Sequence, residues 1–181
     1  ITSDMRRKAK AVNFWVIYGI TGFGLSKMIG ASPAEGNTYI ETFFAKYPTV
    51  RAYYDDLLDN ARASGYVETY FGRRRYIEWL NDANKMTRAG AEREAINMPI
   101  QWTAADVIKL AMIQLDGAIR DQRLQSRLLM QVHDELVLEV VPAEKEIMEK
   151  LVKETMQNVV LFSVPLLVDV GFGKNWNEAK H

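Results

Sequence analysis

At Leu128-Leu-Met-Gln-Val-His-Asp-Glu-Leu-Val-Leu-Glu-Val-Val141 the spacing of apolar residues changes from that of helices to that of β-strands. Two apolar, β-favouring runs, Leu128 to Val132 and Leu136 to Val141, lie on either side of His133-Asp-Glu135. This pattern predicts a β-hairpin with charged residues at its tip. Because helical patterns dominate the chain before this stretch, the predicted fold class is α+β.

The first 65 residues carry signals for four helices. A first helix is predicted from Asp4, as N-cap, to Tyr18, and glycines 19, 22 and 24 then separate it from a short helical piece that ends at Gly30. Ser32 and Glu35 form a capping box around Pro33, which opens a third helix. A fourth helix is predicted from Pro48 to Gly65, where glycine suits a left-handed C-terminal cap.

Other elements follow from β-favouring runs and from proline. Residues 66–70 and 75–79 predict a small hairpin that bears Arg73, Arg74 and Arg75. Helices resume near Asp82 or Asn84, and Pro99 is expected to break or kink the next stretch before an amphipathic helix over 104–119. After the 128–141 hairpin, Pro142 is expected to start a helix to about Val160, and 166–170 to form a final strand.

Composition narrows the classes of protein. The chain has 181 residues, 48% of them hydrophobic, which suffices for one domain or two closely packed subdomains. It has no cysteine, which excludes disulfides, thiolate nucleophiles and iron-sulfur clusters, and its two histidines leave little for a histidine-rich metal site.

The apolar runs are much shorter than the roughly 20 residues that span a bilayer, so no membrane partner is expected. The start, Ile-Thr-Ser-Asp-Met, lacks an initiator Met, and we expect a piece of a longer chain.

Basic and aromatic residues share one face of the first predicted helix. Arg6, Lys10, Phe14 and Tyr18 are spaced four apart and therefore form one slanted stripe. Cations in the first turns oppose the positive end of the helix dipole, a cost that a bound polyanion would reverse. The stripe fits a nucleotide, with triphosphate on the cations and base or sugar on the aromatics. For the stripe alone, a solvated basic turn followed by core aromatics is the simpler explanation.

Two adjacent carboxylates, Asp134 and Glu135, stand at the predicted hairpin tip. We expect two rigid, buried strands to hold them, and like charges held in this way are costly unless a cation lies beside them. Mg²⁺ takes one or two carboxylates plus substrate phosphates, and in pairs it supports phosphoryl transfer. His133 beside the pair could donate to a phosphate or sugar oxygen. A polar β-turn with a structural histidine is the alternative.

Arg93, Asn97 and Gln101 are also spaced four apart on a predicted helix. Such donors can contact the minor groove, where every base pair presents acceptors at nearly the same places. Polar helix faces are common, so this pattern alone indicates little.

Four segments in this order carry a resemblance to a known family. They are Met5-Arg-Arg-Lys-Ala-Lys-Ala-Val-Asn-Phe-Trp-Val-Ile-Tyr-Gly19, Gly65-Tyr-Val-Glu-Thr-Tyr-Phe-Gly-Arg-Arg-Arg-Tyr76, Asn97-Met-Pro-Ile-Gln-Trp-Thr-Ala-Ala-Asp106 and Leu129-Met-Gln-Val-His-Asp-Glu-Leu-Val-Leu138. The chain resembles the C-terminal part of a family A DNA polymerase, the bacterial DNA polymerase I type, over essentially its whole length. The resemblance implies a right-hand polymerase, with a helical fingers subdomain over 1–98 and part of an antiparallel-sheet palm over 99–181.

The resemblance also implies roles for individual residues and partners. Arg6 and Lys10 would hold the triphosphate, with Lys10 a candidate proton donor to pyrophosphate, while Phe14 packs on the sugar and Tyr18 guards the templating position. Asp134 would be a catalytic metal ligand for Mg²⁺, with Glu135 beside it and His133 near the primer terminus. The residues implied to contact primer-template DNA are Arg73, Arg74, Arg75, Arg93, Asn97 and Gln101. The activity implied is addition of deoxynucleotides to a primer 3′ end by two-metal phosphoryl transfer, in the bacterial cytoplasm at the nucleoid.

The chain departs from the family pattern in two ways. Trp15 and Trp102 stand where the family has Gly. We expect them to narrow the space for the templating base or nascent pair and to alter synthesis, unless both indoles point into a core that accommodates them.

The second departure is an absence. The family has another catalytic Asp in a strand motif, and no segment of this chain matches that motif. The second carboxylate of the two-metal site and the thumb would therefore come from another chain or segment. The alternative function is a non-catalytic fragment that binds primer-template or nucleotide. A more distant alternative is a structural α+β domain that binds neither.

Overall fold

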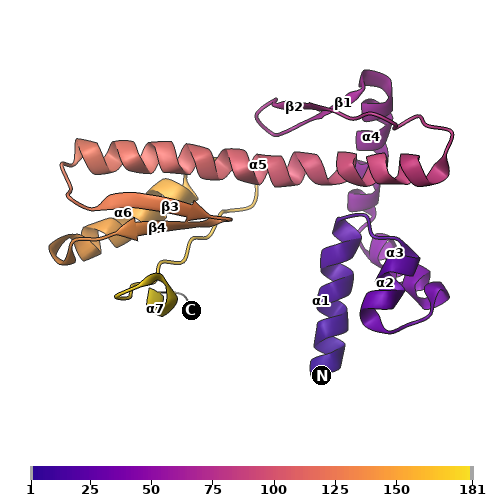
Figure 1. The fold of residues 1–181 in the computed structure, drawn as a ribbon, viewed down its shortest axis with the longest axis horizontal. Helices are drawn as coiled ribbons and strands as arrows, with labels where there is room; N and C mark the ends of the chain where they lie inside the picture. The colour runs from indigo at the N-terminus through magenta and orange to yellow at the C-terminus, as the bar shows by residue number, and fades with distance from the viewer. Residues whose placement is uncertain (1, 180–181) are drawn as a thin grey trace. The chain divides into compact units, whose positions relative to one another are not determined.

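The computed structural model describes residues 2–179, which form two compact units, Ile1–Thr103 and Ala104–His181. Helices predominate, and two small antiparallel sheets accompany them (Figure 1), so the predicted α+β class is confirmed. Among the described residues no helix combines the length and apolar character needed to cross a membrane.

Three helices build the first part of the first unit: α1 (Ser3–Ile17), α2 (Gly22–Ile29) and α3 (Pro33–Lys46). Their core consists of Val16, Leu25, Ile29 and Phe43. The helices α2 and α3 approach closely at Gly36, where an added Cβ would lie 2.2 Å from the main-chain oxygen of Gly22. Two glycines therefore permit a backbone contact that any side chain would prevent.

Side chains cap the N-terminal ends of α1 and α3, and the cap of α3 is the predicted one. The Ser32 hydroxyl accepts from the Glu35 amide at 3.3 Å, and the Glu35 carboxylate accepts from the Ser32 amide at 2.8 Å. This is the predicted capping box. Asp4 as the N-cap of the first helix is wrong, because Thr2 caps α1 by accepting from the Met5 amide at 3.2 Å.

Asp4 instead lies in the first turn of α1, where it forms ion pairs with Arg7 at 2.7 Å and with Lys8 at 3.2 Å. A carboxylate there suits the positive end of the helix and the cations three and four residues later.

The helix α4 (Pro48–Ser64) starts at Pro48 and ends at Gly65, whose φ of +82° confirms the predicted left-handed cap. It leads into the hairpin of β1 (Tyr66–Glu68) and β2 (Arg74–Tyr76), which pair in the register Tyr66 with Tyr76. Both strands are shorter than predicted: β1 ends two residues earlier, and β2 begins one residue earlier and ends three residues earlier. The core under this hairpin consists of Ala61, Val67, Ile77, Leu80, Ala91, Ala95 and Met98.

The helix α5 (Lys85–Asp121) runs without interruption through Pro99, and it contributes residues to both units. The predicted helix break at Pro99 is therefore wrong. Proline removes one helical hydrogen bond and its ring crowds the preceding turn. Here Pro99 is buried beside Met98 and one turn from the fully buried Ala95, so packing outweighs the local preference.

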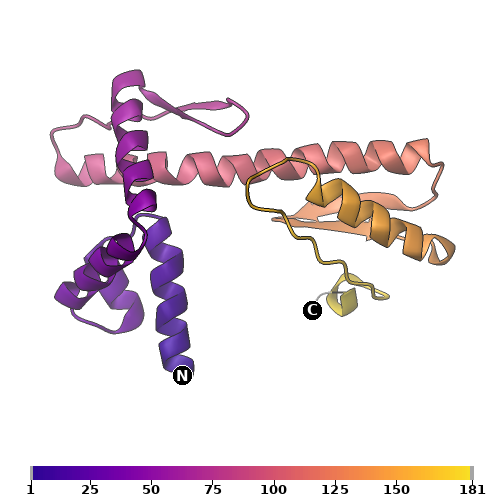
Figure 2. The same cartoon turned by 180° about the vertical axis from the view of Figure 1, so that it is seen from behind.

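The second unit combines a hairpin with helix α6 (Lys145–Gln157), as Figures 1 and 2 show from opposite sides. Strands β3 (Arg127–Val132) and β4 (Glu135–Glu139) pair antiparallel, and the 3₁₀ turn η1 (Pro142–Glu144) precedes α6. The core consists of Leu115, Ile119, Met148 and Val152, with Leu136 and Leu138 packed on it. The predicted hairpin is confirmed, but α6 ends at Gln157 rather than near Val160.

The predicted final strand over 166–170 is wrong, because no strand is present there. Burial does alternate along it, since Val168 and Val170 pack on the core while the Leu167 side chain is 85% exposed. A strand also requires a hydrogen-bonded neighbour, and within residues 2–179 none pairs with this segment. The short helix α7 (Trp176–Ala179) ends the described chain.

Candidate nucleotide and nucleic-acid site

The basic and aromatic stripe lies on an accessible face of α1. Arg6, Lys10 and Phe14 are exposed, and Tyr18 is half-buried at the end of the helix. The Phe14 ring contacts the Tyr18 ring at 5.6 Å between centroids. Phe14 therefore does not belong to a core, and the alternative of a basic turn followed by core aromatics does not hold for this residue. Along α1 the exposed cations Arg6 and Lys10 thus precede two aromatic rings that contact each other.

Two long-range hydrogen bonds hold the C-terminal end of this helix. The Tyr54 hydroxyl, from α4, donates to the Ile17 carbonyl at 2.5 Å. The Asn97 amide, from α5, donates to the Tyr18 carbonyl at 3.3 Å. These carbonyls lie in the last turn, where helices lack internal donors. Side chains from two other helices thus satisfy the end of α1 that carries Tyr18.

Burial raises the pKa of Tyr54 to about 12, with a smaller contribution from Tyr53. The phenol is therefore neutral and able to donate over the whole physiological range. Sequence reasoning missed Tyr54 because its role depends on a contact across 37 residues, and no local pattern marks it.

Asn97, Arg93 and Gln101 lie on α5 as predicted, but only Arg93 and Gln101 are exposed. The Asn97 side-chain oxygen is buried and accepts no hydrogen bond from the described residues. Arg93 packs its side chain near Gly19, where an added Cβ would lie 3.3 Å from Arg93 Cγ. The structure thus brings Arg93 and Asn97 to the end of α1 that carries Tyr18.

The three arginines of the β1–β2 hairpin have different surroundings. Arg74 pairs with Glu68 at 2.6 Å across the strands, and Arg75 pairs with Glu94 of α5. Arg73 lies with its guanidinium carbon 4.2 Å from the centre of the Trp102 ring, and it donates to the Trp102 carbonyl at 3.2 Å. The hairpin is thereby attached to α5.

The second part of the predicted site is the turn between β3 and β4. It contains only His133 and Asp134, because Glu135 belongs to β4 and pairs with Val132. His133 adopts a φ of +54°, and the Gln131 side chain donates to its carbonyl at 2.7 Å. Backbone strain of this kind is common at functional sites.

The two carboxylates differ in accessibility. Asp134 is exposed, and within residues 2–179 its side chain makes no hydrogen bond or ion pair. The half-buried Glu135 accepts from the Trp176 indole N–H at 3.3 Å. The supposition that buried strands hold both carboxylates is corrected, because β3 is largely exposed and only Glu135 is partly enclosed.

The comparisons with known proteins decide the family. Residues 1–178 match the sequence pattern of DNA polymerase family A. The chain belongs to this family. It is 50% identical to DNA polymerase I of Streptococcus pneumoniae and 46% identical to that of Geobacillus stearothermophilus, in each case over 99% of this chain and 20% of the relative. This family A chain thus spans about a fifth of the length of these curated relatives.

A solved structure supports the fold of this family A chain. The POL domain of Pol1 from M. smegmatis, in complex with DNA primer-template and dNTP, is 44% identical, with a TM-score of 0.94 over 100% of this chain and 32% of that chain. The mixed helical and antiparallel architecture is therefore that of part of a family A polymerase domain.

Family A polymerases use divalent metal ions, but no complete metal site is present among residues 2–179 of this chain. No three His, Cys, Asp or Glu residues there are grouped so that they could hold a metal. The donors present are hard carboxylate oxygens, and the exposed Asp134 fits a site in which one or two carboxylates and substrate phosphates share Mg²⁺.

Trp15 and Trp102, the two tryptophans expected to depart from the family pattern, have different environments. Trp15 is 43% exposed beside Tyr18, with 6.3 Å between ring centroids, so it does not point into a core. With Phe14 and Lys10 it lines a pocket of about 400 Å³, to which Arg7 and Ala11 also contribute. Trp102 is half-buried and packs on the core under the hairpin.

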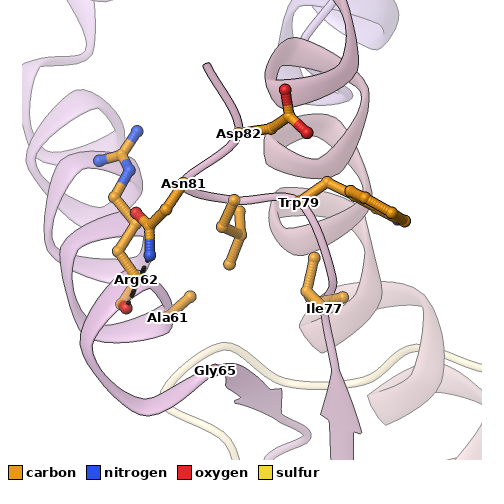
Figure 3. Close-up of a pocket in the computed structure, with 8 residues that line it drawn as sticks. Ala61, Arg62, Gly65, Ile77, Trp79, Asn81 and Asp82 are labelled. Atoms are coloured by element: carbon orange, nitrogen blue, oxygen red, sulfur yellow. Dashed lines mark hydrogen bonds between the residues drawn. The ribbon is translucent and has the colours of Figure 1, made fainter. Parts of the chain in front are cut away.

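A further pocket of about 260 Å³ lies between the C-terminal end of α4 and residues 77–82, the segment that follows β2 (Figure 3). It contains none of the predicted site residues. Arg62 on its wall pairs with Asp59 at 3.0 Å and with Glu92 at 2.7 Å, and the Asn81 amide donates to the Arg62 carbonyl at 3.3 Å. The polar residues on this wall therefore form structural contacts that join α4 to α5 and to the segment after β2.

Proposed function

We propose that this chain is the part of a DNA polymerase that binds the incoming deoxynucleotide and supplies one catalytic carboxylate for template-directed DNA synthesis. The observation that carries the proposal is the exposed stripe on α1, a helix held at its C-terminal end by Tyr54 and Asn97. The similarity to a polymerase domain in complex with primer-template and dNTP supports it. In this proposal 1–98 is the fingers subdomain and 99–181 is part of the palm.

Arg6 and Lys10 bind the triphosphate, since both are exposed in the first turns of α1, where no neighbouring helix covers them. Lys10 also donates the proton to the departing pyrophosphate. Phe14 packs on the sugar, and Tyr18 closes the templating position at the anchored end of the helix. Positioning and charge neutralisation of this kind dominate phosphoryl transfer.

Asp134 is the metal ligand of this chain in the proposal. Its exposed carboxylate leaves room for Mg²⁺ and for a second carboxylate from the remainder of the polymerase. When bound, paired ions of this kind neutralise charge on the reacting phosphate and orient the attacking hydroxyl. Glu135 supports the turn through Trp176, and the strained His133 lies near the primer terminus.

The partners follow from the same arrangement. Arg73, Arg74 and Arg75 contact the duplex backbone, and Arg93, Asn97 and Gln101 contact the nascent pair and its neighbours. Such contacts hold the duplex without reading its sequence. The chain works with a preceding segment that carries the rest of the palm, the thumb and the first catalytic Asp. A cytoplasmic location at the nucleoid follows from this activity.

The test is single-nucleotide primer extension with Mg²⁺. The chain is assayed alone and joined to the preceding segment of the Geobacillus stearothermophilus polymerase, a relative 46% identical. We expect incorporation only in the joined protein, and a loss of about 10³-fold or more in Asp134→Asn. Asp169→Asn, at another exposed carboxylate of the same unit, is the matched control and should leave the rate unchanged.

A joined protein that binds primer-template but incorporates nothing would support the alternative of a non-catalytic binding fragment. Equal rates in Asp134→Asn and Asp169→Asn would show that Asp134 is no metal ligand.

A further inference from the structure

The pocket on α1 has two aromatic walls and a small floor. It measures about 400 Å³ and is lined by Arg7, Lys10, Ala11, Phe14 and Trp15. Ala11 is half-buried against the core of the first three helices, so its short side chain leaves a hollow between larger neighbours. Pockets of this size hold small ligands. Because Phe14 and Trp15 are both exposed, a ligand can reach the two rings from solvent.

The two rings close the C-terminal side of this pocket. Helical side chains lean toward the N-terminus of their helix, so Phe14 and Trp15 lean toward the turn that holds Lys10 and Ala11. The Tyr18 ring contacts both, with its centroid 5.6 Å from that of Phe14 and 6.3 Å from that of Trp15. Aromatic neighbours at such distances stabilise one another. The indole thus has a supported position on the helix surface without belonging to the core.

Ion pairing separates the cations at the other end of the pocket. Asp4 pairs with Arg7 at 2.7 Å and with Lys8 at 3.2 Å. Arg7 also donates to the Met28 carbonyl at 3.4 Å. Lys10, by contrast, makes no hydrogen bond or ion pair with any residue between 2 and 179. An anion that enters the pocket would compete with Asp4 at Arg7, whereas at Lys10 it would replace only water.

A ligand that fits both ends is an aromatic group that carries a chain of phosphates. Lys10 and Trp15 are five residues apart in α1, which corresponds to about 7.5 Å along the helix axis. The triphosphate of a deoxynucleotide matches the unpaired ammonium, and its base matches the indole, the aromatic side chain with the largest surface for stacking. Phe14, which the proposed function assigns to the sugar, lies between the two along the helix.

We propose that the base of the incoming deoxynucleotide stacks on Trp15, and that this contact makes nucleotide affinity depend on the area of the base. The inference rests on the proposed function, which places the triphosphate on Arg6 and Lys10. It deepens that function by assigning a base contact that forms before any template base is present. Because purines offer more surface than pyrimidines, dATP and dGTP should bind more tightly than dCTP and dTTP in the absence of DNA.

The experiment measures the affinity of the joined polymerase for dATP, dCTP and tripolyphosphate by isothermal titration calorimetry, with Mg²⁺ and without DNA. Tripolyphosphate carries the anionic part of the nucleotide and has no base. For Trp15→Ala we expect dATP affinity weaker by about five- to thirtyfold, the usual loss of one stack between a base and an aromatic ring. Tripolyphosphate affinity should be the same in parent and variant, and the preference for dATP over dCTP should shrink.

Two further variants and a control test the geometry. Ala11→Leu fills the hollow but keeps both rings and both cations, so it should also weaken dATP and spare tripolyphosphate. Trp15→Phe keeps a smaller aromatic face and should lose less dATP affinity than Trp15→Ala. Trp79→Gly is the matched control, because Trp79 is an exposed tryptophan of the same unit outside this pocket, and its φ of +70° suits glycine. It should leave all three affinities unchanged.

Two results with Trp15→Ala would overturn the inference. Equal losses of dATP and tripolyphosphate affinity would show that the ring acts through the cations or the helix and not on the base. An unchanged dATP affinity without DNA, together with a raised KM for dATP on primer-template, would show that the template base occupies the pocket instead.

Lys10→Ala distinguishes failure of this inference from failure of the proposed function. If this variant binds dATP and tripolyphosphate as tightly as the parent, the proposed function fails, and the inference fails with it. If Lys10→Ala weakens both ligands and Trp15→Ala weakens neither, the inference alone fails.

Discussion

The Asn97 side chain donates to the Tyr18 carbonyl at 3.3 Å, across 79 positions of sequence. This bond joins the last turn of helix α1 to α5, and it leaves the Asn97 side-chain oxygen buried without a partner among the described residues. A buried polar atom without a partner costs free energy. Asn97 therefore holds the end of α1 at the cost of one buried oxygen of its own side chain that lacks a hydrogen bond.

We expect Asn97→Asp to weaken nucleotide binding more than Asn97→Ala. The aspartate replaces the donor with a second oxygen facing a carbonyl, whereas alanine removes both the donor and the unsatisfied oxygen. The measurement is the KM for nucleotide in the joined polymerase, where a rise of about tenfold in the aspartate variant is expected. Equal KM values for both variants would contradict a role for this hydrogen bond.

Tyr54→Phe removes the other anchor of α1 and should lower the free energy of unfolding by about 1 kcal/mol, the net value of one hydrogen bond. Urea denaturation followed by tryptophan fluorescence measures this loss. Tyr53→Phe is the matched control, because the Tyr53 ring is about half-exposed on the same helix. A Tyr53 variant as destabilised as the Tyr54 variant would argue against the assigned bond.

The same tyrosine predicts a pH dependence at the alkaline end. Burial raises the pKa of Tyr54 from about 10 to about 12, so the unfolded chain loses this proton first. The contribution of Tyr54 to stability is therefore fully present below pH 10 and is lost as pH rises toward 12. The difference in denaturation midpoint between the parent and Tyr54→Phe should shrink over this interval. A constant difference would show that Tyr54 has an ordinary pKa.

Gly36→Ala should destabilise the first unit by about 1–3 kcal/mol, the usual cost of forcing extra volume into a packed contact. The new Cβ would lie 2.2 Å from the Gly22 carbonyl oxygen, and neither backbone can yield without moving its helix. Gly90→Ala in α5 has open space around its Cβ and should be neutral or stabilising. Thermal unfolding of both variants checks the prediction, and an unchanged midpoint for Gly36→Ala would contradict it.

Glu144 predicts an acid dependence in the second unit. Its carboxylate accepts from the Gln125 and Ser126 amides, each at 2.9 Å, and from the Ser126 hydroxyl at 2.6 Å. These bonds, that to Gln125 first, lower the pKa of Glu144. Its contribution to stability is therefore present above the ordinary carboxyl pKa and is lost as pH falls through the lowered one.

Glu144→Gln tests this dependence by urea denaturation at pH 7 and below pH 4. The variant should be less stable than the parent at pH 7, and the difference should narrow in acid. Glu146→Gln, an exposed neighbour in α6, provides the comparison. A gap between parent and Glu144→Gln that is the same at both pH values would refute the assignment.

Local signals were sufficient for much of the fold. The capping box of Ser32 and Glu35, the Gly65 cap and the hairpin around His133 all depend on residues within a few positions of one another. Such interactions are the same in any tertiary context, so a single sequence reveals them. The stripe on α1 was also visible, because helical periodicity alone places its four residues on one face.

Signals that compete with packing were misread. Pro99 would break an isolated helix, but its burial beside Met98 keeps α5 continuous. Residues 166–170 have the alternation of a strand, and no neighbouring strand among the described residues pairs with them. Local preference amounts to a few kcal/mol at most and yields to the surroundings of the segment.

The sequence by itself determined the α+β class, most helix starts and ends, the family and the candidate site residues, because these depend on short-range patterns and on the identity of side chains. Only the tertiary structure decided that Tyr54 and Asn97 hold the end of α1, and that Trp102 lies under Arg73. These contacts join residues 29 or more positions apart, and their geometry comes from how the helices pack. Periodicity can predict which face of a helix is polar, but not which distant side chain meets it.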